Sequence, residues 1–497
     1  MPKDVTRVGA ALLAVAAIAA GCAQTESPDA VTVGVERLTT DENPWVPPRT
    51  PVLDQPAAAH AESAAVAEPT ELDSGDDSDP AAPTATSTTT AQPGTPTSTT
   101  STPGTTTTIA PGATTTSAPP STTTTTAPPG RSCCGEGELD LYVMAKTAFN
   151  PWTGGGHWPW MNEHYESMVV WEPYWDNRLA SFDDVTVYRD SYAIKVDPAK
   201  DSRYGDHPDW VLHEANGDPT YIPFGCNSQC PQYAADIGNQ AFRDHWISEV
   251  QGYVDSGYRG LFIDDVNYLW RFGDVNGNAA EPIDPRTGEP LTLPDWQRYM
   301  TEFLEQVRAE FPQLVIWHNA IWYADSPGFS NNLIDRQIQA ADVIQLERGM
   351  NDKGLKSGTS KYGMQTFMAF IDRVHANGAN VGLLDENATD DQGQWYNIAG
   401  GLLVNNGGDL VTTEDWELIS PTGLFDGYLT NLGHALGPRE VIDGTIQREF
   451  TGGLVVMNEP RSDPVTVDLD DEWVTPSGAT ITSITLGTKE AIVLTRP

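Results

Sequence analysis

The sequence has few positively charged residues. Its 497 residues include 28 Lys and Arg against 69 Asp and Glu, which gives a formal net charge of −41 at pH 7. Phosphate backbones are bound by basic surfaces, so this balance excludes nucleic acid as the main partner. A chain of this length has room for two or three ordinary domains.

Aromatic residues are almost absent from the first quarter of the chain. Between Cys22 and Gly130 the only one is Trp45. The stretch from Ala81 to Pro129 contains 22 threonines with interspersed prolines and no charged residue. Such a composition cannot bury enough apolar surface to offset chain entropy. We therefore predict a disordered linker over residues 23–135, with the composition of an O-glycosylated stalk.

The sequence also lacks an apolar run long enough to cross a bilayer, which takes about 20 residues. The run Val8–Ala20 is shorter and follows Lys3 and Arg7, as in a signal peptide. Small residues before Cys22 resemble the bacterial lipobox. Residues 1–22 are thus predicted to be a lipoprotein signal peptide, and Cys22 to carry the lipid that holds the protein outside the cytoplasm. An ordinary cleaved signal peptide, with a secreted product, is the alternative.

Cysteine is scarce, with five residues in all. Besides Cys22 there are Cys133, Cys134, Cys226 and Cys230, an even number that suggests two disulfides in an exported protein. Cys226 and Cys230 could close a small loop, and pairing with Cys133 and Cys134 is equally permitted. No His-x3-His group accompanies the Cys-x3-Cys spacing, so we predict no metal site.

From Glu138 onward, short apolar runs alternate with helical stretches, a pattern typical of a parallel sheet with covering helices. Eight strands in about 300 residues favour a (β/α)8 barrel, predicted over residues 136–436. A doubly wound open sheet is the alternative, but no Gly-x-Gly-x-x-Gly turn supports a nucleotide-binding version of it. The expected strands are Leu139–Ala145, Ser167–Trp171, Val185–Arg189, Gly260–Asp264, Leu314–His318, Asp342–Leu346, Asn380–Leu384 and Asp409–Val411.

The chain changes character after about Gly437. Four short apolar segments there are broken by Gly, Pro and Asp. They predict a small antiparallel β-sandwich over residues 437–497, packed against the barrel.

Acidic residues stand at the ends of several predicted strands, where the chemistry of such barrels collects. Asp264 ends the fourth strand and Glu347 follows the sixth. Strands four and six are two positions apart around the ring, so their ends can face each other across the mouth. Paired carboxylates indicate glycoside hydrolysis, in which one carboxyl group protonates the leaving oxygen and the other stabilises or attacks the sugar. Capping of the following helix is the alternative for any single acid.

Other polar and aromatic residues near the same predicted rim could bind substrate. Flat aromatic faces stack on sugar rings, and polar side chains hydrogen-bond to hydroxyl groups. The substrate-binding candidates are Tyr188, Arg189, His213, Asp265, Trp317, His318, Asn319, Asp385 and Trp395.

Two segments carry a resemblance to a known group of proteins. Residues 236–267 and 341–349 resemble the hypothetical glycosyl hydrolase family 15 and, more distantly, polygalactosaminidase-type barrels. The resemblance implies that an Asp after strand four is the nucleophile and a Glu after strand six the acid/base. These roles carry over to Asp264 and Glu347, with Asp265 leaving the first assignment ambiguous by one residue. It also implies an α-linked glycan as substrate.

The sequence thus predicts an exported, monomeric glycoside hydrolase that acts on a carbohydrate polymer without a cofactor. We expect a retaining mechanism, which needs carboxyl groups about 5–5.5 Å apart, whereas inversion needs about 6.5–9.5 Å. A carbohydrate-binding lipoprotein without catalysis is the competing interpretation. A metal-dependent polysaccharide deacetylase is disfavoured, because the nine histidines show no metal-binding spacing.

Overall fold

The computed structural model describes residues 135–146, 158–171, 179–320, 332–385, 387–413 and 423–497. The predicted signal peptide, the lipid site Cys22, the linker, Cys133 and Cys134 lie outside these ranges. Among the described residues, no helix is both long and apolar enough to cross a membrane.

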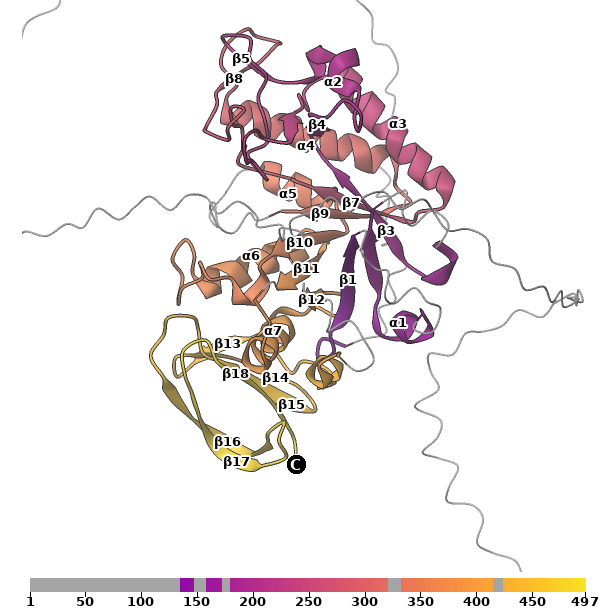
Figure 1. Ribbon diagram of the computed structural model, residues 1–497. Coiled ribbons are helices and arrows are strands. Elements are labelled where there is room, and N and C mark those ends of the chain that lie inside the picture. Colours follow the sequence, from indigo (N-terminus) through magenta and orange to yellow (C-terminus); the bar gives the residue numbers. More distant parts are fainter. Residues whose placement is uncertain (1–134, 147–157, 172–178, 321–331, 386, 414–422) are drawn as a thin grey trace, which may run out of the picture. The chain divides into compact units, whose positions relative to one another are not determined.

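Eight parallel strands close into a barrel in the order β1-β12-β11-β10-β9-β7-β3-β2 (Figure 1). Each strand pairs in parallel with both neighbours. The predicted (β/α)8 architecture is confirmed. The strands are β1 (Asp140–Lys146), β2 (Ser167–Val170), β3 (Val185–Asp190), β7 (Gly260–Asp264), β9 (Val315–Asn319), β10 (Val343–Glu347), β11 (Asn380–Asp385) and β12 (Leu410–Thr413).

Helices cover the barrel, and their ends follow local sequence signals. The longest two start at residues whose side chains accept backbone N–H bonds, Asn239 before α3 and Thr292 before α4. Helix α3 ends at Gly257, whose φ of 105° suits glycine. The α-helices are α1 (Trp158–His164), α2 (Arg203–Asp206), α3 (Gln240–Ser256), α4 (Leu293–Glu310), α5 (Asn332–Gln339), α6 (Met364–Ala376) and α7 (Asp391–Val404), and the 3-10 helices are η1 (Leu179–Ser181), η2 (Pro208–Trp210), η4 (Gly349–Asn351) and η6 (Asp426–Leu429).

The barrel interior is filled by side chains. Alternate residues of the strands point inward, and they form an apolar cluster separate from the larger core under the helices. At Gly382 a Cβ atom would lie 2.7 Å from Trp317 Cζ3, so glycine makes room for that indole ring. The interior cluster consists of Tyr142, Val169, Phe262, Trp317, Val343, Leu384 and Leu410.

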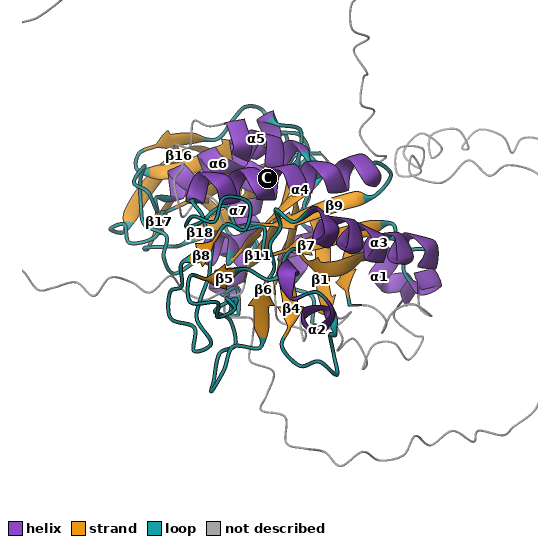
Figure 2. Cartoon of the chain, turned by 90° about the horizontal axis from the view of Figure 1, so that it is seen from above, coloured by secondary structure: helices purple, strands orange, loops and turns teal. Residues whose placement is uncertain are grey.

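Two long connections, after β3 and after β7, pack on each other. They carry β4 (Ala193–Lys195), β5 (His213–Glu214), β6 (Gln232–Ala234) and β8 (Pro282–Ile283), and β5 pairs with β8. Figure 2 shows these short strands and α2 grouped at one side of the chain.

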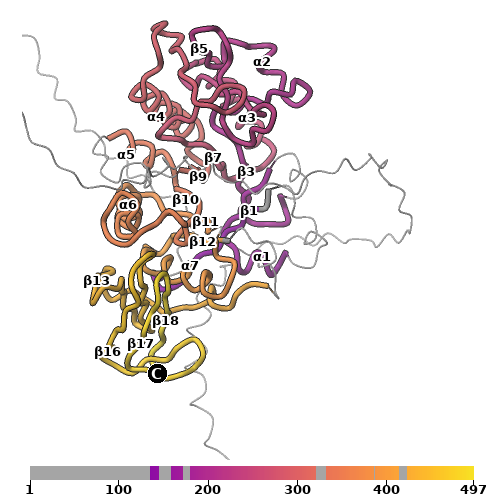
Figure 3. The backbone as a smooth tube through the Cα atoms, turned by 60° about the vertical axis from the view of Figure 1, so that its left-hand side comes forward, coloured from indigo at the N-terminus to yellow at the C-terminus, as the bar shows by residue number. Residues whose placement is uncertain are grey.

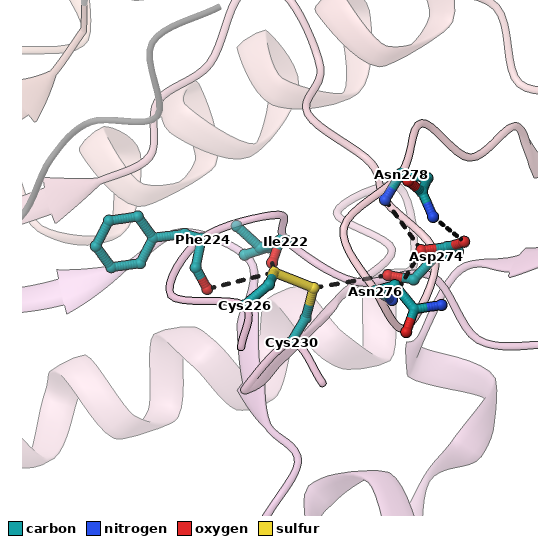
Figure 4. Close-up of a disulfide and its surroundings, with 7 residues drawn as sticks. All are labelled: Ile222, Phe224, Cys226, Cys230, Asp274, Asn276 and Asn278. Atoms are coloured by element: carbon teal, nitrogen blue, oxygen red, sulfur yellow. Dashed lines mark hydrogen bonds between the residues drawn. A yellow bond between two sulfur atoms is a disulfide. The ribbon is translucent and has the colours of Figure 1, made fainter. Parts of the chain in front are cut away.

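A disulfide joins Cys226 to Cys230 within the first of these connections (Figure 4). This is one of the pairings that the sequence left open, and it is confirmed. The backbone N–H of Cys230 donates to the carbonyl oxygen of Val275, which ties the disulfide loop to the second connection. There, Asp274 Oδ1 accepts the backbone N–H of Asn276 and of Asn278, so this carboxylate stabilises its own turn.

The C-terminal residues form six antiparallel strands, which lie next to α7 (Figure 3). The predicted antiparallel domain is confirmed, as one continuous sheet in the order β13-β14-β15-β18-β16-β17. Strands β16 and β18 pair only at Val474 and Thr495, while apolar side chains of β15 to β18 share one cluster, so two parts of this sheet enclose a core between them. The strands are β13 (Glu440–Ile442), β14 (Thr445–Glu449), β15 (Gly453–Met457), β16 (Val465–Val474), β17 (Thr480–Leu486) and β18 (Ala491–Thr495).

Candidate active site

The two predicted catalytic carboxylates lie at the same end of the barrel. Asp264 is the last residue of β7 and Glu347 the last of β10. Strand β9 lies between these two strands in the ring, and it ends at Asn319. All three side chains are half-buried, and they follow the inward-facing positions of their strands.

The amide of Asn319 connects the two carboxylates. Its Nδ2 donates to Asp264 Oδ1 at 2.8 Å and to Glu347 Oε1 at 2.9 Å. Because both distances start from one nitrogen atom, the two oxygens are at most their sum, 5.7 Å, apart. This upper limit is close to the separation of about 5–5.5 Å in retaining glycosidases and below the inverting range of about 6.5–9.5 Å.

Asp264 is oriented by two further donors. The Tyr188 hydroxyl donates to Oδ2, and the backbone N–H of Asp265 donates to Oδ1 at 2.8 Å. Burial and the neighbouring Asp264 charge raise the pKa of Tyr188 well above its ordinary value, so the phenol keeps the proton that it donates. The Asp264 carboxylate is thus held in one orientation by groups on three neighbouring strands.

The adjacent Asp265 has different partners. Its backbone is left-handed, with φ of 55°, and its Oδ1 accepts hydrogen bonds from the Arg271 guanidinium and from Asn267 Nδ2. Burial raises the pKa of Asp265, an effect that Arg271 opposes and Asp264 reinforces. Of the two neighbouring aspartates, only Asp264 shares the Asn319 amide with Glu347. The geometry therefore pairs Asp264, and not Asp265, with Glu347.

A third aspartate, Asp190, lies beside this pair and was not predicted as a site residue. It is the last residue of β3 and is in register with Asp264. Burial first, and then the charges of Asp265 and Asp264, raise its pKa well above the ordinary value. Its Oδ1 accepts the backbone N–H of Tyr192 and of Ala193. Its position at the end of a strand was visible in the sequence, but its closeness to Asp264 depends on strand order.

Three of the predicted substrate-binding residues, Arg189, His318 and Asp385, do not join the carboxylate pair. They occupy the strand positions whose side chains face away from the barrel interior. Arg189 pairs with Glu249 on helix α3, outside the barrel wall. His318 is 0% exposed, and burial lowers its pKa to about 3.

Asp385 likewise binds the segment beyond β10 rather than facing the barrel mouth. It accepts hydrogen bonds from the backbone N–H of Asn351, at 3.1 Å, and from Asn351 Nδ2, at 2.7 Å. Burial raises its pKa to about 7. Lys489 of the C-terminal sheet donates to the Asn351 carbonyl oxygen, so this cluster joins the barrel to that sheet.

The remaining predicted substrate contacts have other surroundings. Trp317 is 1% exposed in the barrel interior and presents no open face to a sugar. Trp395 lies on α7 with its ring centroid 5.3 Å from that of Phe425. His213 lies on β5, in the connection after β3. Within the described ranges, no cluster of three or more His, Cys, Asp or Glu residues is placed to hold a metal ion.

Residues 184–454, more than half of the chain, match the family described as hypothetical glycosyl hydrolase family 15. The chain belongs to this family. It is therefore a glycoside hydrolase, as the resemblance of its strand-end segments predicted, and its substrate is a carbohydrate. No curated protein matches the chain.

Solved structures with similar folds share little sequence with this member of hypothetical glycosyl hydrolase family 15. The glycoside hydrolase domain of PelA from Pseudomonas aeruginosa is 12% identical, with 55% of this chain and 94% of that chain covered and a TM-score of 0.34. The maltogenic α-amylase AmyB from Thermotoga neapolitana is 13% identical, with 72% and 99% covered and a TM-score of 0.43. Trehalose-6-phosphate hydrolase from Bacillus licheniformis is 11% identical, with 73% and 100% covered and a TM-score of 0.44.

Proposed function

We propose that this protein is a retaining glycoside hydrolase with Asp264 as nucleophile and Glu347 as general acid/base. The observation that supports this most directly is the Asn319 amide, whose two hydrogen bonds limit the carboxylate oxygens to 5.7 Å. That spacing leaves room for a sugar carbon between the carboxylates but little for an additional water molecule.

The reaction follows in two displacements. In the first, protonated Glu347 gives its proton to the glycosidic oxygen while Asp264 forms a bond to the anomeric carbon, and the carbon–oxygen bond to the leaving group breaks. In the second, Glu347 takes a proton from water, and the water oxygen replaces the Asp264 carboxylate at that carbon. Asn319, Tyr188 and the Asp265 N–H keep Asp264 directed at the reacting carbon throughout.

The proposed substrate is an α-linked oligosaccharide or polysaccharide. Residues 131–497 carry 55 acidic and 24 basic residues. This charge favours neutral or basic sugars over polyanionic ones, with a preference that salt weakens.

We also propose that the enzyme acts outside the cytoplasm, as a monomer. The support is in the sequence, where an apolar run and small residues precede Cys22. Lipid on Cys22 would anchor the chain, and residues 23–135 would space the barrel from the membrane. Metabolic labelling with a fatty acid, compared between the parent and Cys22→Ser, tests this, and equal labelling of the two would contradict it.

The test of the activity uses the full chain on a panel of α- and β-linked glycans. Asp264→Asn and Glu347→Gln should each abolish release of reducing sugar, because each removes one of the two reacting carboxyl groups. Asp372→Asn is the matched control, since this carboxylate is exposed and pairs with Arg439 on the outside. Cleavage that survives both substitutions would overturn the mechanism. Glycan binding without any cleavage would favour the carbohydrate-binding alternative.

A further inference from the structure

Trp171 is the exposed end of a series of aromatic rings that begins in the barrel interior. It directly follows β2, and its side chain is 37% exposed, whereas the interior ring of Phe262 is 1% exposed. The ring of Tyr188 lies between them, with its centroid 5.3 Å from that of Trp171 and 5.9 Å from that of Phe262. An indole left open to water in this way forgoes the free energy that burial of its apolar surface would give.

Tyr188 also connects Trp171 to the proposed nucleophile. The Tyr188 hydroxyl donates to Asp264 Oδ2 while its ring contacts both Trp171 and Phe262. A ring held by a hydrogen bond at its polar end and by stacking on Phe262 gives Trp171 a rigid backing. The exposed indole is therefore fixed on the Asp264 side of the carboxylate pair.

We infer that Trp171 forms the aromatic platform for the sugar that Asp264 attacks. This inference rests on the proposed function. A pyranose ring of the glucose or galactose type presents C–H groups on one face and hydroxyl groups at its edges. The C–H face stacks on the indole, while the hydroxyl groups meet the polar groups around Asp264.

The surroundings also define the chemical class of that sugar. Asp190, Asp264 and Asp265 lie together at this side of the mouth. A sugar carboxylate or sulfate would be repelled by the Asp264 carboxylate, so the sugar on Trp171 is a neutral or basic pyranose. Because the platform lies on the nucleophile side, it binds the sugar that becomes attached to Asp264 and not the leaving group.

The experiment compares the parent with Trp171→Ala and Trp171→Phe. The probes are 4-nitrophenyl and 2,4-dinitrophenyl glycosides of glucose, galactose and mannose in both anomeric forms, with the matching glucuronides. Loss of the stacking surface predicts that Trp171→Ala lowers kcat/KM by about 5- to 150-fold, which corresponds to about 1–3 kcal/mol at 1.4 kcal/mol per tenfold. The decrease in kcat/KM should be the same for both leaving groups. Trp171→Phe should keep part of the activity that Trp171→Ala loses. The glucuronides should be poor substrates of all three proteins.

Tyr362→Ala is the matched control. Tyr362 is also 37% exposed, and it lies in the connection after β10 with Lys361 over its ring. This variant should hydrolyse the probes at the parent rate. Unfolding in urea identifies any loss that comes from instability and not from the missing ring.

Three outcomes would overturn the inference, each distinguishable from failure of the proposed function. The first is full activity of Trp171→Ala on a probe whose hydrolysis requires Asp264. The second is a loss that depends on the leaving group, which would put Trp171 on the other side of the scissile bond. The third outcome applies if the parent hydrolyses no probe. The NMR signal of the Trp171 indole N–H, identified by its absence in Trp171→Phe, is then recorded while the methyl glycosides of the same sugars are added. A signal that shifts with none of these glycosides would overturn the inference. A shift without hydrolysis would support the platform and contradict the proposed activity.

Discussion

Polar residues occupy both the inward-facing and the outward-facing positions of the barrel strands, but their partners differ. On β3, Tyr188 points inward and binds Asp264, whereas the next residue, Arg189, points outward and pairs with Glu249. On β9, Asn319 joins the two carboxylates, whereas the preceding His318 is fully buried. Residue type alone therefore does not identify a site residue in this fold. The parity of its position, which decides whether the side chain faces the barrel interior, is needed as well.

The largest effect should separate the neighbours Asp264 and Asp265. We expect Asp264→Asn to lower kcat by roughly 10⁴-fold or more, as loss of a nucleophile does. Asp265→Asn should cost about tenfold or less, because Asp265 is bound by Arg271 and Asn267 instead of by Asn319. Steady-state kinetics on the best substrate of the glycan panel measures both, and the reverse ranking would contradict the comparison.

Asn319→Ala should have the next largest effect. It removes the donor common to both carboxylates, and loss of one such oriented donor costs about 10²- to 10³-fold in kcat. Asn319→Asp, which keeps the size but replaces the donor with a third carboxylate, should be at least as damaging. A loss of less than about tenfold for both variants would mean that the amide does not position the pair.

Tyr188 and Arg189 offer a direct test of parity. Tyr188→Phe removes a hydrogen bond to a charged oxygen and should lower kcat by about 10- to 100-fold. Arg189→Met breaks a partly exposed ion pair with Glu249, so it should lower the free energy of unfolding by about 1 kcal/mol and leave kcat unchanged. Kinetics and urea unfolding of both variants check this. A catalytic defect confined to Arg189→Met would contradict the assignment of faces.

His318 gives an expected effect on stability alone, a pH dependence of the free energy of unfolding. Its pKa of about 3 in the folded state lies below the ordinary 6.5, so the unfolded chain binds a proton first as the pH falls. The stability contributed by neutral His318 is present above pH 6.5 and is lost between about pH 6.5 and 3, by about 1.4 kcal/mol per pH unit. His318→Leu should reduce this slope. Urea unfolding at several pH values measures it, and an unchanged slope in His318→Leu would contradict the account.

Much of this architecture was predictable from local patterns. Apolar runs alternating with helices predicted the barrel, and they also placed Asp264 and Glu347 at the ends of its fourth and sixth strands. The sequence also left the Cys226–Cys230 pairing open as one possibility, which the structure contains. These features depend on residues close together in the chain.

The surroundings of the other predicted site residues depend on features that a single sequence does not contain. Arg189, His318 and Asp385 each lie one residue away from a position that faces the barrel interior. An error of one residue in the predicted alignment of a strand therefore reverses the predicted face. Trp317 has the side chain of a sugar-stacking residue. Its indole ring is buried inside the barrel, however, in the space left by Gly382 on β11. Asp190 joins the site through its register with Asp264, 74 residues further along the chain.

The configuration of the first product tests the central claim most directly. The full-length enzyme would be mixed with the best substrate of the glycan panel, and the anomeric protons of the released sugar followed by NMR before mutarotation. The arrangement of Asp264 and Glu347 around Asn319 predicts a product with the same anomeric configuration as the substrate. Initial release of the opposite anomer would contradict a mechanism in which Asp264 attacks the sugar.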